Sequence, residues 1–254
     1  TGKATEYGGS QMRPEATGYG AVYFLRNMLS HADQEIEGKT AVISGAGNVA
    51  IHAAEKLVQL GGKVLTLSDS GGFIYDPDGL DQEKIDWVKR LKNERRGRIS
   101  EYADEYPEAT YHEDEQPWSV ECDVALPCAT QNELDEGAAK LLLKNGCIAV
   151  SEGANMPTTL EGVKAFHDAK IMYGPGKAAN AGGVAVSGLE MSQNSERVSW
   201  NHERLGEELA ELMDGIHDKC VEFGEADGYV DYVRGANIAG FKKVADAMLA
   251  FGVV

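Results

Sequence analysis

The order of hydrophobic and polar residues divides most of the chain into short strands and amphipathic helices. β-rich runs predict strands at residues 40–44, 63–68, 122–126, 147–150 and 171–173. Apolar residues at helical spacing fill the intervals, in a helix that starts at Pro14 and then at residues 50–58, 85–91, 133–144 and 158–168. Residues 76–79 (Asp-Pro-Asp-Gly) predict a turn, and residues 92–117 are charged and irregular. From Gly182 onward the pattern is helical except at residues 229–235.

This alternation of strands and helices predicts an α/β fold. Strands that alternate with helices form a Rossmann-like, doubly wound and mostly parallel sheet, here followed by C-terminal helices. We expect residues 1–200, including the N-terminal helix, to form a dinucleotide-binding domain. Residues 201–254 are expected to form a separate C-terminal helical segment.

The sharpest local motif is a G-x-G-x-x-A sequence, Gly45-Ala-Gly-Asn-Val-Ala50, between a predicted strand and a predicted helix. In this context such a motif binds a dinucleotide. Gly45 permits the tight turn, Gly47 lets the backbone approach a pyrophosphate, and Ala50 allows the helix to pack closely on the strand. The helix N-terminus then offers unpaired N–H groups to the phosphates. The alternative is a glycine-rich turn that binds no ligand.

The second strand ends where a Rossmann-type domain contacts the adenosine ribose. Asp69 lies there, and an acid at this position favours NAD because it accepts a hydrogen bond from the ribose 2′-OH. Hydroxyl groups flank it at Ser68 and Ser70, however, and a basic group follows at Lys92, Arg95, Arg96 and Arg98. Hydroxyls and cations suit a 2′-phosphate. We therefore expect NADP, with NAD as the less favoured alternative and a solvated basic turn as the explanation without a ligand.

The composition narrows the classes of partner. The chain has 254 residues, with 24 Lys or Arg against 41 Asp or Glu, which gives a formal net charge of −17. Such a surface disfavours nucleic acid and anionic membranes, and no apolar run is long enough to span a bilayer. The four cysteines match no zinc spacing, so we expect reduced, buried thiols, no metal site and a cytoplasmic location. The amino end has no signal-peptide pattern and no initiator Met, which suggests a fragment or a processed product.

Six further segments occur in order along the chain. They are Gly8-Gly-Ser10, Arg13-Pro-Glu-Ala-Thr-Gly-Tyr-Gly20, Leu126-Pro-Cys-Ala-Thr-Gln-Asn132, Glu152-Gly-Ala-Asn-Met-Pro157, Gly176-Lys-Ala-Ala-Asn-Ala-Gly-Gly183 and Gly235-Ala-Asn-Ile-Ala-Gly240. Together with the G-x-G-x-x-A motif, here called the fingerprint, this set closely resembles the coenzyme-binding domain and C-terminus of the hexameric, bacterial-type, NADP-dependent glutamate dehydrogenases. The resemblance covers essentially the whole chain.

The resemblance implies a reaction and a set of site residues. The reaction is the reversible oxidative deamination of L-glutamate to 2-oxoglutarate and ammonia, with hydride transfer between the substrate Cα and the nicotinamide. The positions implied to contact the coenzyme, besides Gly45, Gly47, Asp69 and Ser70, are Thr17, Asn48, Val49, Ala129, Thr130, Gln131 and Asn155. Lys92 and Arg95 match basic positions of the NADP-preferring members.

The substrate positions implied by the resemblance are Asn180, Val184 and Ser187. Asn180 and Val184 match the wall between nicotinamide and substrate, and Ser187 matches the hydroxyl that binds the glutamate side-chain carboxylate. A hydroxyl facing a carboxylate selects glutamate over apolar amino acids, because an apolar substrate would leave polar groups unpaired. Without the resemblance, Ser187 would be interpreted as a helix serine bonded to its own turn.

The resemblance also implies a substrate domain, with a catalytic lysine and aspartate, that this chain does not contain. Oxidative deamination needs general acid–base groups beside the Cα, and no lysine–carboxylate pair here suits that role. We therefore expect the chain to bind coenzyme and to catalyse little alone. In the full enzyme it would form part of a homo-hexamer and turn an apolar face toward the absent domain, at Ile238, Phe241, Val244, Met248 and Leu249.

Three other functions stay open at this point. A stand-alone dinucleotide-binding module would work without any catalytic lysine and aspartate. A leucine or phenylalanine dehydrogenase would need an apolar pocket, and Ser187 counts against it. A structural protein with a vestigial site is weakened by the intact Gly45, Gly47, Asn48 and Ser187.

Overall fold

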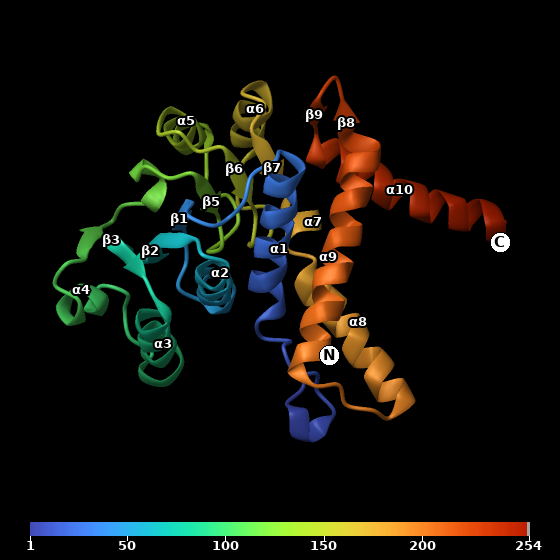
Figure 1. Cartoon of the computed structure of the whole chain (residues 1–254), viewed down its shortest axis with the longest axis horizontal. Coiled ribbons are helices and arrows are strands. Elements are labelled where there is room, and N and C mark those ends of the chain that lie inside the picture. Colours follow the sequence, from blue (N-terminus) through green and yellow to red (C-terminus); the bar gives the residue numbers. More distant parts are fainter. Residues whose placement is uncertain (253–254) are drawn as a thin grey trace.

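The structure, a computed structural model, describes residues 1–252 and is built around a seven-stranded sheet (Figure 1). The strands, in chain order, are β1 (Thr40–Ile43), β2 (Lys63–Asp69), β3 (Gly72–Leu80), β4 (Thr110–Glu113), β5 (Val124–Leu126), β6 (Ala149–Ser151) and β7 (Met172–Gly174). Their order in the sheet is β4-β3-β2-β1-β5-β6-β7. β2, β1, β5, β6 and β7 are parallel, whereas β3 is antiparallel to β2 and to β4. The predicted Rossmann-like, mostly parallel α/β fold is confirmed.

Helices cover both faces of this sheet. One face carries α1 (Ala16–His31), α2 (Asn48–Gln59) and α3 (Gln82–Arg90), and the other carries α5 (Glu136–Lys144) and α6 (Leu160–Asp168). In β1, Ala41 and Ile43 belong to the apolar cluster on the first face and Val42 to the cluster on the second. Successive strand side chains point to opposite faces. A strand covered on both sides therefore needs an unbroken apolar run, which is the pattern seen in the sequence.

The C-terminal part of the described chain is mostly helical. It consists of α7 (Gly176–Ala179), α8 (Gly182–Glu196), α9 (His202–Gly224), the hairpin strands β8 (Glu225–Ala226) and β9 (Tyr229–Val230), and α10 (Tyr232–Phe251). α9 packs on α1, where the aromatic rings of Phe24 and His217 meet edge-on with 5.6 Å between their centroids. α10 starts beside α9 and then extends away from the body of the molecule (Figure 1).

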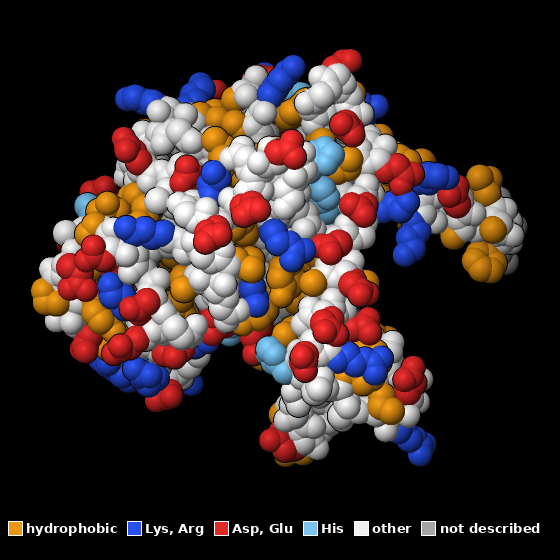
Figure 2. All heavy atoms as spheres, viewed as in Figure 1, with side chains coloured by type: hydrophobic (Ala, Val, Ile, Leu, Met, Phe, Trp, Pro, Cys, Tyr) orange, Lys and Arg blue, Asp and Glu red, His pale blue; other side chains and the backbone are white. Residues whose placement is uncertain are grey.

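The outer part of α10 is apolar and exposed, as the sequence predicts. The exposed fractions of Phe241, Met248 and Leu249 are 74, 65 and 82%. Hydrophobic side chains are visible on the projecting end in Figure 2, whereas Ile238, nearer the body, is half-buried. Contiguous apolar surface of this kind marks an interaction site. None of the described helices is both long enough and apolar enough to span a bilayer.

The edge of the sheet beyond β2 differs from the sequence prediction. Residues 76–79 do not form a turn between elements but lie inside β3, at an irregularity in its pairing with β2. The Asp78 N–H donates to the Asp76 side chain at 3.1 Å, so local turn chemistry persists within the strand. Residues 92–117 were expected to be irregular, but they contain α4 (Glu101–Glu105) and β4, most of η2 (Leu91–Arg95) and the first residue of η3 (Pro117–Ser119). The structure of this edge depends on pairing between strands that are distant in sequence, and the local spacing of apolar residues does not encode such pairing.

Two helix starts also differ from the prediction. α1 begins at Ala16 rather than at Pro14, after a short helical turn η1 (Thr5–Tyr7). α10 begins at Tyr232, inside the stretch expected to be non-helical, because Asp231 caps it by accepting from the Arg234 N–H.

Candidate functional site

The fingerprint turn joins β1 to α2 and leaves the start of that helix open. Gly45 has φ +89°, a left-handed conformation that favours glycine, and its N–H donates to the Ser68 hydroxyl at 2.7 Å. A Cβ at Gly45 would lie 3.1 Å from the Cys128 carbonyl oxygen, whereas a Cβ at Gly47 would meet nothing within 4 Å. Within residues 1–252, no side chain caps α2. Its first N–H groups are therefore available to an anion.

A pocket lies in front of this turn, at the carboxyl ends of β1, β2 and β5. Its volume is about 320 Å³, and it is lined by Gly45, Ala46, Gly47, Ser68, Asp69, Ser70, Lys92, Gln116, Cys128, Ala129, Thr130 and Glu133. The fold thus brings together predicted coenzyme residues from four separate segments. Ligands of open α/β sheets bind in such a crevice outside the carboxyl ends of the strands.

Asp69 holds one wall of this pocket in place. Its carboxylate accepts hydrogen bonds from the Ile99 N–H at 2.9 Å, the Gly71 N–H at 3.0 Å and Lys92 Nζ at 3.1 Å. Burial alone would raise the pKa of Asp69, but these donors outweigh burial and lower that pKa. The carboxylate is therefore ionised, and three donors already use most of its roughly four acceptor positions. It anchors the segment after α3 that carries Lys92, and it also lines the pocket.

The basic residues after α3 do not all face this pocket. Lys92 lines it. Arg98 donates from Nη1 to the Ser70 hydroxyl at 2.7 Å, which brings a second cation to the rim. Arg95, which the sequence assigns to the coenzyme, pairs with Glu101 at 2.6 Å and is not among the lining residues. Neither Arg95 nor Arg98 is among the lining residues, but Arg98 contacts Ser70, which is.

A second pocket continues from the first across the shared segment 128–130. It is lined by Thr1, Arg13, Thr17, Val49, Cys128, Ala129, Thr130, Gln131, Gly153, Ala154, Asn155, Asn180, Gly183, Val184 and Ser187. Seven predicted site residues line this pocket and not the first one: Thr17, Val49, Gln131, Asn155, Asn180, Val184 and Ser187. Asn48 lines neither pocket, because its amide donates to the Pro14 carbonyl and ties the start of α2 to the start of α1.

Asn155 and Asn180 meet on one wall of the second pocket. Asn180 Nδ2 donates to Asn155 Oδ1 at 2.8 Å and to the Ala154 carbonyl at 3.2 Å. Each side-chain amide carries both a donor and an acceptor group. The pair can therefore still offer one NH2 group and one carbonyl oxygen to a polar ligand.

Two carboxyl groups that were not predicted from the sequence hold the loops of the site, the buried Glu152 and the half-buried Glu133. Glu152 accepts from the Tyr173 hydroxyl at 2.5 Å and the Gly176 N–H at 2.6 Å. Glu133 accepts from the Ala129 N–H at 3.0 Å. Burial raises the pKa of both carboxyl groups, although these hydrogen bonds oppose the shift. The sequence signal that could have revealed these two residues is an acidic residue in or next to an apolar motif at a strand end. A carboxyl group in such a place needs hydrogen-bond donors from the nearby backbone.

The helix α8 crosses α1 at backbone contact distance. A Cβ at Gly182 would lie 2.1 Å from the Ala16 carbonyl oxygen, and a Cβ at Gly183 would lie 2.3 Å from Thr17 Oγ1. Only residues without a side chain allow this approach. The two glycines thereby bring Ser187, one turn further along α8, to the start of α1.

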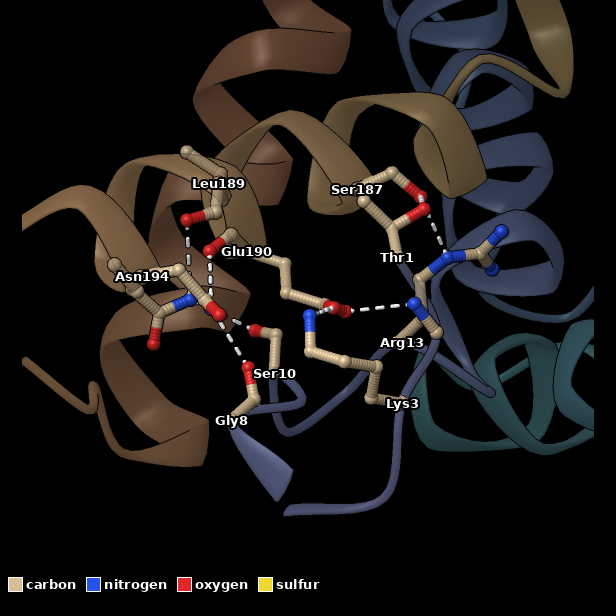
Figure 3. A network of polar contacts seen from close by, with 11 residues as sticks. Thr1, Lys3, Gly8, Ser10, Arg13, Ser187, Leu189, Glu190 and Asn194 are labelled. Atoms are coloured by element: carbon tan, nitrogen blue, oxygen red, sulfur yellow. Dashed lines mark hydrogen bonds and ion pairs between the residues drawn. The ribbon is translucent and has the colours of Figure 1, made fainter. Parts of the chain in front are cut away.

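Ser187 is bonded across the pocket rather than to its own helical turn. Arg13 Nε donates to Ser187 Oγ at 2.9 Å, and the Thr1 hydroxyl donates to the same atom at 3.1 Å (Figure 3). Arg13 carries the one charged side chain among the described residues that line this pocket. Arg13 shares a sequence motif with Thr17, but its role is not visible in the sequence, because only the fold brings it to Ser187.

Acid–base groups are sparse in this part of the molecule. Lys177 donates from Nζ to Asn237 Oδ1 on α10 at 2.6 Å and does not line the pocket. The lining of the second pocket, as far as the structure describes it, contains no lysine and no carboxylate. Residues 1–252 also contain no cluster of side chains that could hold a metal ion, and the four cysteines are free and buried, as predicted.

Comparison with known sequences shows strong similarity over the whole chain. Residues 8–252 match the family described as Glutamate/Leucine/Phenylalanine/Valine dehydrogenase. The chain is 60% identical to the glutamate dehydrogenase of Bacteroides thetaiotaomicron, over 100% of this chain and 57% of that protein. At the same coverage it is 53% identical to the NADP-specific glutamate dehydrogenase of Salmonella typhimurium and 51% identical to the NAD-specific glutamate dehydrogenase of Bacteroides fragilis. The chain thus spans 57% of the length of these relatives.

Comparison with solved structures gives the same result for the fold. A glutamate dehydrogenase of Plasmodium falciparum superimposes with a TM-score of 0.96 and 48% sequence identity, over 100% of this chain and 55% of that chain. The names of the relatives include both coenzymes, so they do not distinguish NAD from NADP for this chain.

Proposed function

This chain belongs to the glutamate/leucine/phenylalanine/valine dehydrogenase family, and we propose that it is the coenzyme-binding part of an NADP-dependent glutamate dehydrogenase. One observation carries the proposal: two neighbouring pockets, which share residues 128–130 and are here together called the cleft, reach from the open N-terminus of α2 to the pair Arg13–Ser187. One end of the cleft offers N–H groups to a pyrophosphate. The other end offers a cation and a hydroxyl to a carboxylate. The proposed reaction is the reversible oxidative deamination of L-glutamate to 2-oxoglutarate and ammonia.

The residues of the cleft suit a dinucleotide. The open space at Gly47 admits a phosphate to the backbone, and Ser70 and Lys92 would face the adenosine end. When bound, the nicotinamide supplies the hydride chemistry. The amides of Asn155 and Asn180 would hold its carboxamide at one angle, which a stereospecific transfer requires.

The far end of the cleft favours a dicarboxylate substrate. Arg13 and Ser187 present a charge and a hydroxyl in one place. A leucine or phenylalanine side chain would leave the Arg13 charge and the Ser187 hydroxyl hydrogen without an acceptor from the substrate, and a site built for hydrogen bonds rejects such substrates strongly. We therefore place the glutamate side-chain carboxylate at Arg13 and Ser187, with Val184 and Asn180 between it and the nicotinamide.

Turnover would need groups outside this chain. The pocket lining described above lacks a lysine–carboxylate pair, so we place the catalytic lysine and aspartate on a substrate domain of the whole enzyme. The exposed apolar side of α10 is a suitable surface for that domain. Assembly of the whole enzyme as a homo-hexamer is part of the same proposal and rests on the resemblance of the sequence.

Coenzyme titration is expected to show tighter binding of NADPH than of NADH. Lys92 and Arg98 supply two cations beside Ser70, and hydrogen bonds to charged groups each contribute about 1.5–3 kcal/mol. Replacing Lys92 or Arg98 with alanine should weaken NADPH binding by roughly tenfold, a loss of about 1.4 kcal/mol, and should change NADH binding little. Isothermal calorimetry at fixed ionic strength measures all of these dissociation constants.

Arg95→Ala is the matched comparison for this titration. Its guanidinium is already paired with Glu101 outside the pocket, so the structure predicts a smaller loss of NADPH affinity than for Arg98→Ala. A larger loss for Arg95→Ala would support the assignment made from the sequence instead. NADH binding equal to or tighter than NADPH binding would contradict the proposed coenzyme.

Ser187→Ala is expected to raise the KM for glutamate of the full-length protein roughly tenfold, because one hydrogen bond to a charged carboxylate is lost. Ser192→Ala is the control on the same helix, since the Ser192 hydroxyl bonds its own turn at the Gly188 carbonyl. Steady-state kinetics with varied glutamate measure both variants. An unchanged KM in Ser187→Ala would place the substrate carboxylate elsewhere.

A second candidate function is a dinucleotide-binding module that performs no catalysis. The lack of a lysine or carboxylate in the described lining favours it. Nucleotide binding without glutamate turnover in the full-length protein would decide for this candidate. Turnover by the full-length protein would decide against it.

A further inference from the structure

The first residues of the chain lie along one face of α8 (Figure 3). Asn194 Nδ2 donates to the Gly8 carbonyl at 2.7 Å, and Glu190, one turn earlier, accepts from the Gly2 N–H at 2.8 Å. Ser187, another turn earlier, accepts from Thr1. Side chains three and four residues apart on a helix share one face. Residues 1–10, here called the N-terminal segment, are therefore fastened to three successive turns of α8.

Glu190 is the central contact of this segment. Its side chain is fully buried, and Lys3 Nζ pairs with Glu190 Oε1 at 2.6 Å. Burial alone would raise the pKa of Glu190, but the donors Lys3, Gly2 and the Ser10 N–H outweigh burial and lower that pKa to about 2. Glu190 is thus a buried carboxylate at neutral pH, and it depends on the N-terminal segment for its donors.

The same segment controls the hydrogen bonds of Ser187. A serine hydroxyl has one donor hydrogen and two acceptor positions. Thr1 and Arg13 both donate to Ser187 Oγ, so both acceptor positions are filled and the hydroxyl hydrogen is left to be donated. A carboxylate accepts hydrogen bonds and cannot donate them. With these two neighbours in place, Ser187 is oriented for a carboxylate ligand.

We propose that the Lys3–Glu190 ion pair is a positioning pair for the substrate site, because it holds Thr1 and Arg13 against Ser187. The inference rests on the proposed function. Lys3 and Glu190 do not line the second pocket, so they act through the placement of Thr1, next to Gly2, and through the path of the chain to Arg13. The Lys3 carbonyl also meets Gly9, where a Cβ would lie only 1.8 Å from that oxygen. A displacement of Lys3 would therefore also displace Gly9 and the residues between Gly9 and Arg13.

A positioning role and a purely structural role predict different kinetics. If the pair only stabilises the fold, its loss lowers the melting temperature and leaves the KM values of the folded enzyme unchanged. If it positions Ser187, its loss raises the KM for the dicarboxylate and leaves coenzyme binding unchanged, since the fingerprint turn lies on other elements. The ratio of the two KM values therefore separates the roles.

The experiment uses the full-length protein with Lys3→Met and Glu190→Gln. Lys3→Met leaves Glu190 buried with backbone donors only, and we expect the KM for glutamate to rise about tenfold, with kcat within about threefold and the coenzyme KM unchanged. Glu190→Gln keeps an oxygen for the Gly2 N–H but loses the ion pair, so its effect should be smaller and in the same direction. Lys164→Met is the control, because it removes an exposed ion pair with Asp168 on α6.

Hydrogen exchange supplies a second readout that does not depend on turnover. Amides of residues 2–10 should exchange faster in Lys3→Met than in the wild type, and amides of β1 and α2 should not change. An unchanged glutamate KM in Lys3→Met, with an active wild type, would overturn this inference alone. A wild type that binds coenzyme but does not turn over glutamate would overturn the proposed function and this inference with it.

Discussion

Replacing Gly47 with alanine is expected to weaken NADPH binding by roughly 100-fold, about 2.7 kcal/mol, without lowering the melting temperature of the protein. Gly47 has φ −88° and ψ −171°, which any residue adopts, and an added Cβ meets nothing within 4 Å in the protein itself. The added methyl group would instead occupy the space through which a pyrophosphate approaches the backbone. Calorimetric titration and a thermal melt of the same sample measure the two quantities.

Gly45→Ala is the matched variant for this experiment. Its φ of +89° disfavours any residue with a Cβ by about 1–2 kcal/mol, and the Cβ would also press on the Cys128 carbonyl. We expect Gly45→Ala to lower the melting temperature, unlike Gly47→Ala. A Gly47→Ala protein that binds NADPH like the wild type would show that the phosphates do not pass over this turn.

Replacing Lys84 with methionine is expected to lower the free energy of unfolding by about 3–5 kcal/mol, the range for breaking a buried ion pair. Lys84 Nζ lies 2.7 Å from Asp76 Oδ2, and the Asp76 side chain is fully buried in β3. Burial lowers the pKa of Lys84, but Asp76 and Glu108 outweigh burial and raise that pKa, so the lysine stays charged. Methionine keeps much of the apolar stem and leaves the Asp76 carboxylate without its cation, with the Tyr102 hydroxyl as a remaining donor.

Denaturation by urea at neutral pH, followed by far-UV circular dichroism, measures this loss. Lys140→Met is the control, because it removes an exposed ion pair with Glu136 on α5 and should cost no more than about 0.5 kcal/mol. A loss below about 1 kcal/mol for Lys84→Met would mean that the carboxylate of Asp76 reaches water once the lysine is gone.

The Lys84 network also bears on the coenzyme site. It joins β3 to α3 and, through Tyr102, to α4. The segment that carries Lys92, in η2, and Arg98, after η2, lies between these two helices. Stability in this region therefore supports the placement of the cations that we assign to the 2′-phosphate.

Much of the fold follows from local patterns in the sequence. The apolar runs of the parallel strands had to be unbroken because helices cover both faces, and that pattern is visible without coordinates. The fingerprint was recognisable because its glycines act on their own backbone and on the adjacent helix start. The apolar side of α10 was expected from the resemblance to a known family, and the structure shows it exposed.

Other features depend on contacts that no local pattern encodes. The strand β3 and its irregularity at residues 76–79 depend on pairing with β2 and β4. Arg95 and Arg98 differ in their partners, because Arg95 pairs with Glu101 whereas Arg98 donates to Ser70. Arg95 and Arg98 are both arginines of the same basic stretch, so only the tertiary structure distinguishes their roles.

The sequence by itself determined the α/β class, the open turn at Gly45 and Gly47, and the place of Asp69 at the end of the second strand, because each follows from spacing within one or two elements. Only the tertiary structure decided that Arg13 meets Ser187 and that Lys3 meets Glu190, across 174 and 187 positions of the chain. Such pairs form where the glycines of α8 let it approach α1. The free energy that holds them comes from burial and packing of distant segments, which a linear pattern does not record.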